Sequence, residues 1–240
     1  MITVVKAKDR YFQDLKTMQV HSLFSFSNHY EPENLYFGDI FVFKDYLTKP
    51  GYGFGMHPHE DFEVTLVYLQ GKMFFQDCTG ADVPSPPGMV HRITAGTGHA
   101  HKITNVGDDV SRYISIWMLP KLEGLAPSHS CRQFDPQCWK NKVFTLVSDT
   151  PPPLFDDRNN CLVFNGRGSI NRCELDKATA LDIPLPEDSS SLLYVLDGEL
   201  LLNEEALNAG DHARISATRE IQVQGSPLAD FILITTTERM

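Results

Sequence analysis

Short runs of β-branched and aromatic residues recur along the whole chain, and long stretches with helical periodicity are scarce. Examples are FVFKDYL, FEVTLVYLQ, YISIWML, LLYVLDG and FILITT, which are separated by glycine, proline, asparagine and aspartate. Short apolar or alternating runs bounded by such residues are typical of strands in β-sandwiches and β-barrels. The sequence therefore predicts an all-β fold.

Two parts of the chain resemble each other. LVYLQGKMFFQD, followed by SPPGMVHRI, matches LLYVLDGELLLNE, followed by LNAGDHARI; each predicts a strand, a glycine and a second strand. Unrelated hairpins also look alike, but two copies of one barrel module suit 240 residues. We expect two tandem jelly-roll-like barrels packed on each other in a monomer, over residues 1–125 and 156–240, with a linker over 126–155.

The charge and the cysteines narrow the function classes. The formal charge is −10, from 21 Lys and Arg against 31 Asp and Glu, and no dense basic run offsets it. This disfavours direct binding to nucleic acid or to an anionic membrane. No apolar run suits a signal peptide or a membrane span. Five cysteines without a CxxC pair indicate reduced thiols, so we expect a cytoplasmic protein.

Histidines gather in the first half of the chain, where seven of the nine lie. Residues two apart on a strand share a face, so His57 and His59 point the same way, as do His99 and His101. Glu63 stays in phase with the first pair if the strand has no bulge. Converging imidazoles and a carboxylate suit a divalent first-row transition metal; the alternative is a pair of solvated edge-strand histidines. The second barrel is predicted to lack metal ligands.

The series HxHxxxE, a hairpin glycine and a later glycine-rich turn with histidine resembles the two-part signature of cupins, small β-barrels with a metal inside. Two registers fit its second part. One uses Pro86-Pro87-Gly88 and His91, and the other uses Gly98-His99-Ala100-His101 followed by Asn105. The choice between these two registers decides which histidine is expected to bind the metal together with His57 and His59.

A narrower resemblance decides that register. HSLFSFSNHY, GFGMHPHEDFE, AGTGHAHKITN and ISIWMLP resemble, in order and spacing, the pirin family of bicupins, over roughly residues 1–120. The resemblance implies a metal, usually iron, on His57, His59 and His101, with a glutamate two residues after the last histidine. It also implies either quercetin 2,3-dioxygenase activity, as in some bacterial members, or an iron-binding nuclear co-regulator, as in eukaryotic ones.

This chain departs from the family at the fourth ligand, because Ile103 stands where the glutamate is expected. Glu63, the carboxylate that ordinary cupins use, is the first candidate to replace it, either as a ligand or as the catalytic proton acceptor. His99 is the second candidate. A third outcome is a weakened site that is often empty.

Two functions follow from the resemblance. In the first, the metal and an apolar pocket, with Phe24, Phe26, Phe54 and Met56 as candidate lining residues, promote the oxidation of a small aromatic, flavonol-like phenol by dioxygen. In the second, a non-catalytic metal-binding or metal-sensing module acts through a protein partner. Ile103 favours the second function, and the three histidines are compatible with both.

Overall fold

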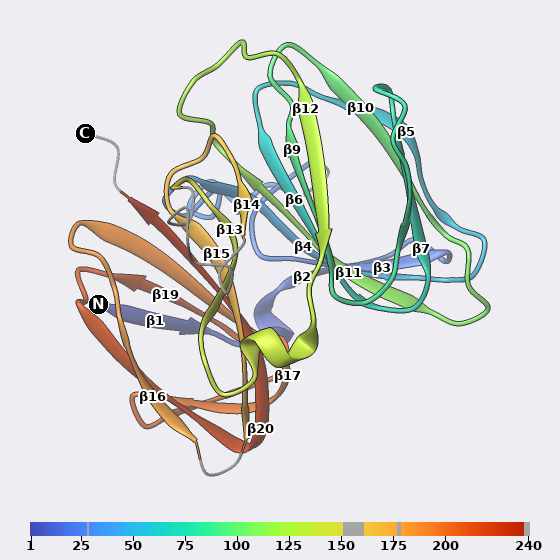
Figure 1. The fold of residues 1–240 in the computed structure, drawn as a ribbon. Coiled ribbons are helices and arrows are strands. Elements are labelled where there is room, and N and C mark those ends of the chain that lie inside the picture. Colours follow the sequence, from blue (N-terminus) through green and yellow to red (C-terminus); the bar gives the residue numbers. More distant parts are fainter. Residues whose placement is uncertain (28, 151–160, 177–178, 238–240) are drawn as a thin grey trace.

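Two β-barrels pack side by side in the computed structural model, which describes residues 1–27, 29–150, 161–176 and 179–237 (Figure 1). Two sheets form the N-terminal barrel, with strand orders β12-β9-β6-β11-β4-β3-β2 and β5-β10-β7-β8. The prediction of an all-β chain with two tandem barrels is confirmed. The strands of this barrel are β2 Tyr11–Asp14, β3 Met18–Ser22, β4 Ile40–Thr48, β5 Gly53–His59, β6 Glu63–Gln70, β7 Met73–Asp77, β8 Asp82–Ser85, β9 Met89–Thr94, β10 His99–Asn105, β11 Ser111–Met118 and β12 Ser128–Gln133.

The C-terminal barrel is one sheet of order β1-β19-β17-β20-β15-β13-β14, with β16 on β20 and β18 on β17. In the described part of the chain, no helix is long and apolar enough to cross a membrane. The strands are β1 Ile2–Val5, β13 Phe144–Ser148, β14 Leu162–Val163, β15 Ser169–Asp176, β16 Ala180–Pro184, β17 Ser189–Leu202, β18 Glu205–Asn208, β19 His212–Ser216 and β20 Glu220–Thr237, and the 3-10 helices are η1 Ala7–Asp9 and η2 Pro136–Trp139.

The strands do not follow the predicted boundaries at either end of the N-terminal barrel. β1 pairs with β19, so residues 2–5 lie in the C-terminal sheet, as Figure 1 shows. The predicted linker, 126–155, supplies β12 to the first barrel and β13 to the second. β12 is a polar edge strand, SHSCRQ, and shows no apolar alternation in the sequence. Residues 151–155 of that linker lie outside the described residues.

Apolar side chains of the described residues form three cores: one inside each barrel and one between the barrels. Strand β6 contributes to two of them. Its Leu66 and Tyr68 face the interior of the first barrel, whereas Val67, on the opposite face, packs in the core between the barrels. Burial on both faces explains why FEVTLVYLQ is an almost continuous apolar run.

The internal repeat takes different forms in the two barrels. In the first barrel, Gly71 separates β6 from β7 with φ +83°. In the second, Gly198 lies inside the single long strand β17, which shifts register on both sides of it. Gly198 has φ +76°, and a Cβ there would lie 1.9 Å from the carbonyl oxygen of Leu228. Only glycine fits this bend, so the second copy continues as one bent strand instead of ending.

Candidate metal centre

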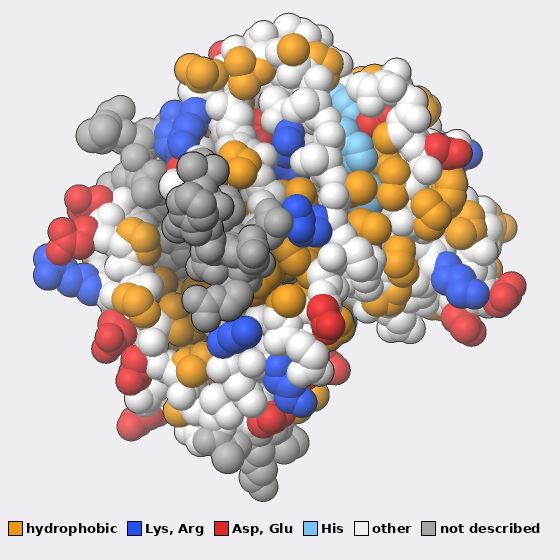
Figure 2. Space-filling model, in the orientation of Figure 1, with side chains coloured by type: hydrophobic (Ala, Val, Ile, Leu, Met, Phe, Trp, Pro, Cys, Tyr) orange, Lys and Arg blue, Asp and Glu red, His pale blue; other side chains and the backbone are white. Residues whose placement is uncertain are grey.

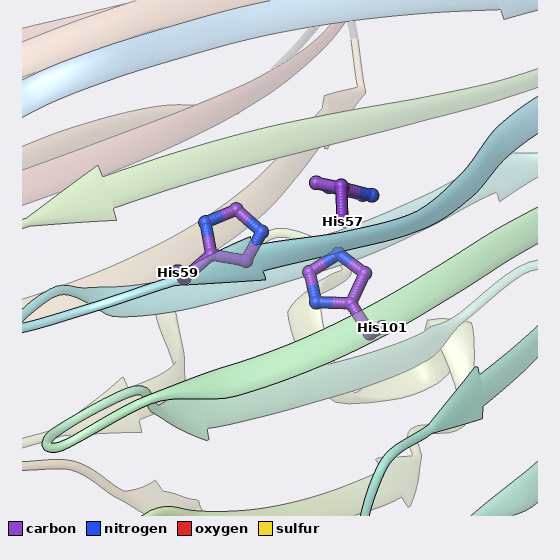
Figure 3. A group of neighbouring side chains, drawn as sticks. All are labelled: His57, His59 and His101. Carbon is purple, nitrogen blue, oxygen red and sulfur yellow. The ribbon is translucent and has the colours of Figure 1, made fainter.

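Three histidines from two paired strands converge inside the first barrel (Figure 3). His57 and His59 lie on β5, and His101 lies on β10 directly opposite His57. The ring centroids are 4.9 Å apart for His57 and His59, 4.5 Å for His57 and His101, and 4.7 Å for His59 and His101. One nitrogen of each ring lies within 4.8 Å of the others, so the group could hold a metal ion.

A bulge in β5 makes this convergence possible. Phe54 pairs with Ile103 and His57 pairs with His101, so three steps along β5 match two steps along β10. The extra residue changes the alternation, and Phe54 therefore lines the same cavity as the two histidines of β5.

Two of the three imidazoles carry buried nitrogens without partners. Neither ring nitrogen of His59 nor Nδ1 of His101 has a hydrogen-bond partner among the described residues. Burial, followed by the charges of neighbouring imidazoles, lowers the pKa of His59 to about 3 and that of His101 to about 2. Both rings are therefore neutral at physiological pH, which is the form that donates a lone pair to a metal. Unpartnered buried nitrogens are costly, and a metal ion would satisfy them.

His57 is oriented by its own strand. Its Nδ1 lies 2.8 Å from the carbonyl oxygen of Gly55, which can only accept a hydrogen bond. Nδ1 therefore carries a proton, and Nε2 is the nitrogen left for a metal. A backbone carbonyl that fixes the tautomer is a common support for a metal-binding histidine. The donor set is three imidazoles, which suit a divalent first-row metal with positions left open.

Glu63 does not lie in the group formed by these three histidines. Between β5 and β6 the chain bends at Asp61, which has φ 47°, and the alternation that would put Glu63 in phase with His59 ends there. Glu63 lies on the face of β6 opposite Leu66, which lines the histidine cavity. Its Oε2 accepts hydrogen bonds from Thr94 Oγ1 at 3.0 Å and from the Asn165 amide of the second barrel at 3.1 Å. In this position Glu63 links the two barrels.

That link gives the stability a pH dependence. Burial raises the pKa of Glu63 to about 7, although hydrogen bonds from Asn165 and Thr94 and the guanidinium of Arg92 lower it. Because the folded-state pKa lies above the ordinary 4.5, the contribution of Glu63 is fully present below about pH 4.5 and is lost as the pH rises through 7. The protein should therefore lose up to about 3 kcal/mol of stability over this range through Glu63.

Glu63→Gln should remove this loss, because the amide oxygen still accepts both hydrogen bonds and does not ionise. Denaturant unfolding at several pH values between about 4.5 and 8.5 measures it, with the exposed Glu60→Gln as the matched control. Parallel stability profiles for wild type and E63Q would contradict the prediction.

His99, the other candidate to replace the missing ligand, has its own partner. Its Nε2 lies 3.0 Å from Oδ2 of Asp77, and both side chains are fully buried. The His99 ring centroid is 6.1 Å from that of His101, and His99 is outside the group of three. Burial opposes ionisation of Asp77, but hydrogen bonds from Thr79, Ala81 and His99 lower its pKa to about 2. His99 thus pairs with an ionised carboxylate.

A cavity of about 250 Å³ opens beside the three histidines. Phe26 and Phe54 line it as predicted, whereas Phe24 is buried in the core between the barrels and Met56 is exposed. Trp117 also lines it and packs edge-on against His59, with ring centroids 4.5 Å apart. No carboxylate is found among the described residues around the cavity, which also include Ile103, Tyr46, Tyr113, Ser22, Ser115 and Gln13.

The sequence did not single out Lys44, a basic residue that lines the same cavity. Its Nζ lies 4.2 Å from the centroid of the Phe26 ring, and burial lowers the pKa of its ammonium group to about 8. The signal available in the sequence is a lysine inside an otherwise apolar run, IFVFKDYL. A lysine with a lowered pKa can accept a proton near neutral pH.

Two β-barrels, one of them with a cavity lined by histidines, define a bicupin. The family model described as Pirin matches residues 5–118, and the model described as Quercetinase C-terminal cupin domain matches residues 155–235. The chain belongs to the pirin family.

Relatives and solved structures agree with this assignment. A "Pirin-like protein" of Caulobacter vibrioides is 29% identical over 211 residues, 88% of this chain and 89% of that protein. The "Quercetin 2,3-dioxygenase" of Escherichia coli K12 is 32% identical over 136 residues, 56% of this chain and 59% of the enzyme. The crystal structure of the E. coli bacterial pirin YhhW in complex with nickel(II) superposes with a TM-score of 0.90 at 24% identity and covers 100% of both chains.

Proposed function

We propose that the N-terminal barrel binds one divalent first-row metal on His57, His59 and His101 and oxidises a flavonol-like phenol with dioxygen. The observation that carries the proposal is the convergence of three imidazoles, two of them buried with unpartnered nitrogens, beside a cavity with aromatic walls. The name of the E. coli relative supports the reaction, and the nickel complex of YhhW supports the metal. Iron and nickel are the first metals to test.

The charge of the cavity favours an anionic ligand. Imidazole ligands bring no negative charge to a divalent ion, and no carboxylate is present among the described lining residues. Lys44 adds a further positive charge when it is protonated. A phenolate, flat enough to lie against Trp117 and Phe54, matches both the charge and the walls of this cavity.

Different residues of the cavity bind the metal and transfer the substrate's proton. A metal held by His57, His59 and His101 would act as a Lewis acid toward the phenol. Trp117 packs edge-on against the His59 ring and supports its position, and aromatic side chains form part of the cavity wall. Lys44 takes the phenol proton on Nζ when it is neutral, or stabilises the phenolate when it is charged. Glu63, which the sequence offers as the proton acceptor, faces the second barrel.

The direct test is oxygen consumption with quercetin by protein loaded separately with iron and with nickel, after subtraction of the reaction without enzyme. Metal-loaded protein that neither consumes oxygen nor changes its absorption spectrum with quercetin would overturn the enzymatic proposal. The alternative, a metal-binding module that acts through a protein partner, is favoured by Ile103 in place of the family's glutamate. A metal-loaded, inactive protein that recovers one stoichiometric partner would support that alternative.

Lys44→Met should lower kcat/KM for quercetin by about 100-fold while the metal content stays unchanged, since loss of a positioned proton acceptor typically costs this much. In the wild type, kcat/KM should rise as the pH passes through about 8, where Lys44 becomes neutral, and K44M should lack this rise. Oxygen-electrode assays across this range measure both effects. Lys102→Met, on the opposite face of β10 from His101, is the control. Equal pH profiles for K44M and wild type would exclude Lys44 as the acceptor.

A further inference from the structure

A second group of metal-ligating side chains lies in the first barrel, away from the three histidines. His91 is on β9, and His129 and Cys131 are two residues apart on β12, with Cys131 directly opposite His91. One donor atom of each lies within 4.8 Å of the others. The ring of Phe75 separates the two groups, with its centroid 5.4 Å from that of His101, 4.5 Å from that of His91 and 4.6 Å from that of His129.

The two histidines face each other through one nitrogen each, and their other nitrogens face oxygens. His91 Nδ1 lies 3.0 Å from His129 Nε2, while His91 Nε2 lies 2.9 Å from Ser85 Oγ. His129 Nδ1 lies 3.7 Å from Oδ2 of Asp77. Oxygen partners on the distal nitrogens are what orient metal-binding histidines in proteins. One nitrogen of each ring and the Cys131 sulfur lie within 4.8 Å of one another, so a single ion can reach all three.

The spacing of the two facing nitrogens suits a tetrahedral ion. Zinc–nitrogen bonds of about 2.0–2.1 Å put two ligating nitrogens roughly 3.3 Å apart, so the observed 3.0 Å needs an adjustment of a few tenths of an ångström. His91 is fully buried, whereas Cys131 is only partly buried on an edge strand, which gives an ion a route from solvent. Figure 2 shows histidine side chains reaching the surface on the side of the first barrel that carries β12.

We propose that His91, His129 and Cys131 form a second metal site, for a thiophilic divalent ion such as zinc, independent of the three-histidine site. Two imidazoles and a thiolate match the ligand preference of zinc, and three protein ligands leave a fourth position for water. Binding exchanges the Cys131 thiol proton for the metal–sulfur bond and releases that proton to solvent. The hydrogen bond between the histidines is given up, and a proton on His91 moves to Nε2, where Ser85 Oγ accepts a hydrogen bond as readily as it donates one.

Cobalt(II) is the probe, because a bound thiolate gives it a charge-transfer band that imidazole ligands alone do not. The protein is the full chain with His57→Ala and His101→Ala, which removes the first site. We expect one equivalent of cobalt to bind with this band, and zinc to displace it. Adding Cys131→Ser should abolish the band and weaken cobalt binding at least about 100-fold, since loss of an outer partner alone costs up to that much. Adding Cys78→Ser, an exposed thiol of the same barrel, should change nothing.

Absence of the band in the double variant, or a band that survives Cys131→Ser, would overturn the proposal. Thermal unfolding of each variant verifies the fold, and His129→Asn, at a partly exposed position, provides a second ligand variant that should also lose the band. The wild type separates the two sites. One cobalt with the thiolate band means that only the second site exists, and one cobalt without the band means that only the first site exists.

Discussion

His101→Ala should empty the first metal site. His101 is the proposed ligand on β10, opposite His57, and its removal would leave the ion with two of the three proposed protein donors. We expect metal affinity to fall at least about 100-fold, and the content of protein purified without a histidine tag to fall from near-stoichiometric to near zero. Metal analysis by mass spectrometry, in a Cys131→Ser background so that only the first site counts, measures this.

His21→Ala is the matched control, because His21 is a half-buried histidine of the same barrel that does not line the cavity. Its metal content should equal that of the wild type. Metal retained by His101→Ala would mean that the three imidazoles are not the ligand set. A wild type that refuses added iron and nickel would mean that the site no longer binds a metal, and the search for partners would then take precedence.

Ile103→Glu should strengthen metal binding and destabilise the protein when no metal is present. Ile103 is 2% exposed, lines the cavity and shares a face of β10 with His101, so a carboxylate there points toward the ion. The attraction between two unit charges at about 4 Å is about 4 kcal/mol in a protein environment. After desolvation we expect about 100-fold tighter binding, or about 2.7 kcal/mol.

The same carboxylate without a metal is an unpaired buried charge, and we expect it to lower the free energy of unfolding by about 3 kcal/mol. Chelator competition measures the affinity, and thermal unfolding with and without metal measures the stability. Ile103→Gln is the control: it also places a polar group in the core but lacks the charge, so its affinity should stay near that of the wild type. Equal affinities for the glutamate variant and the wild type would contradict the prediction.

The sequence was enough to predict structural features that depend only on residues close together in the chain. Alternation and turn residues were enough for the all-β barrels, and residues two apart on one strand were enough to place His57 and His59 on one face. Glu63 shows the limit of this reasoning. The prediction that Glu63 shares a strand face with His59 requires an uninterrupted strand from residue 59 to residue 63. The bend at Asp61 ends that strand.

Features that depend on pairing between strands far apart in the sequence could not be predicted from local patterns. The position of Lys44 in the cavity follows from which face of β4 meets the interior, and that is decided by β3 and β11 on either side of it. The meeting of His91 with His129 and Cys131 depends on β12, whose polar edge-strand sequence looks like a linker. In both cases the residue types are visible in the sequence, but their neighbours are not.

The pairing of β1 with β19 affects how the chain can reach its native state. Among the described strands, residues 2–5 pair with residues 212–215, so during synthesis this pairing cannot form until almost the whole chain has been made. Contacts of such long sequence separation form slowly, because the loop between them must close before the contact stabilises anything. Until then the C-terminal sheet has an open edge along β19, onto which a strand from another molecule can add. We therefore expect the partly folded chain, more than the native protein, to be prone to strand exchange between molecules.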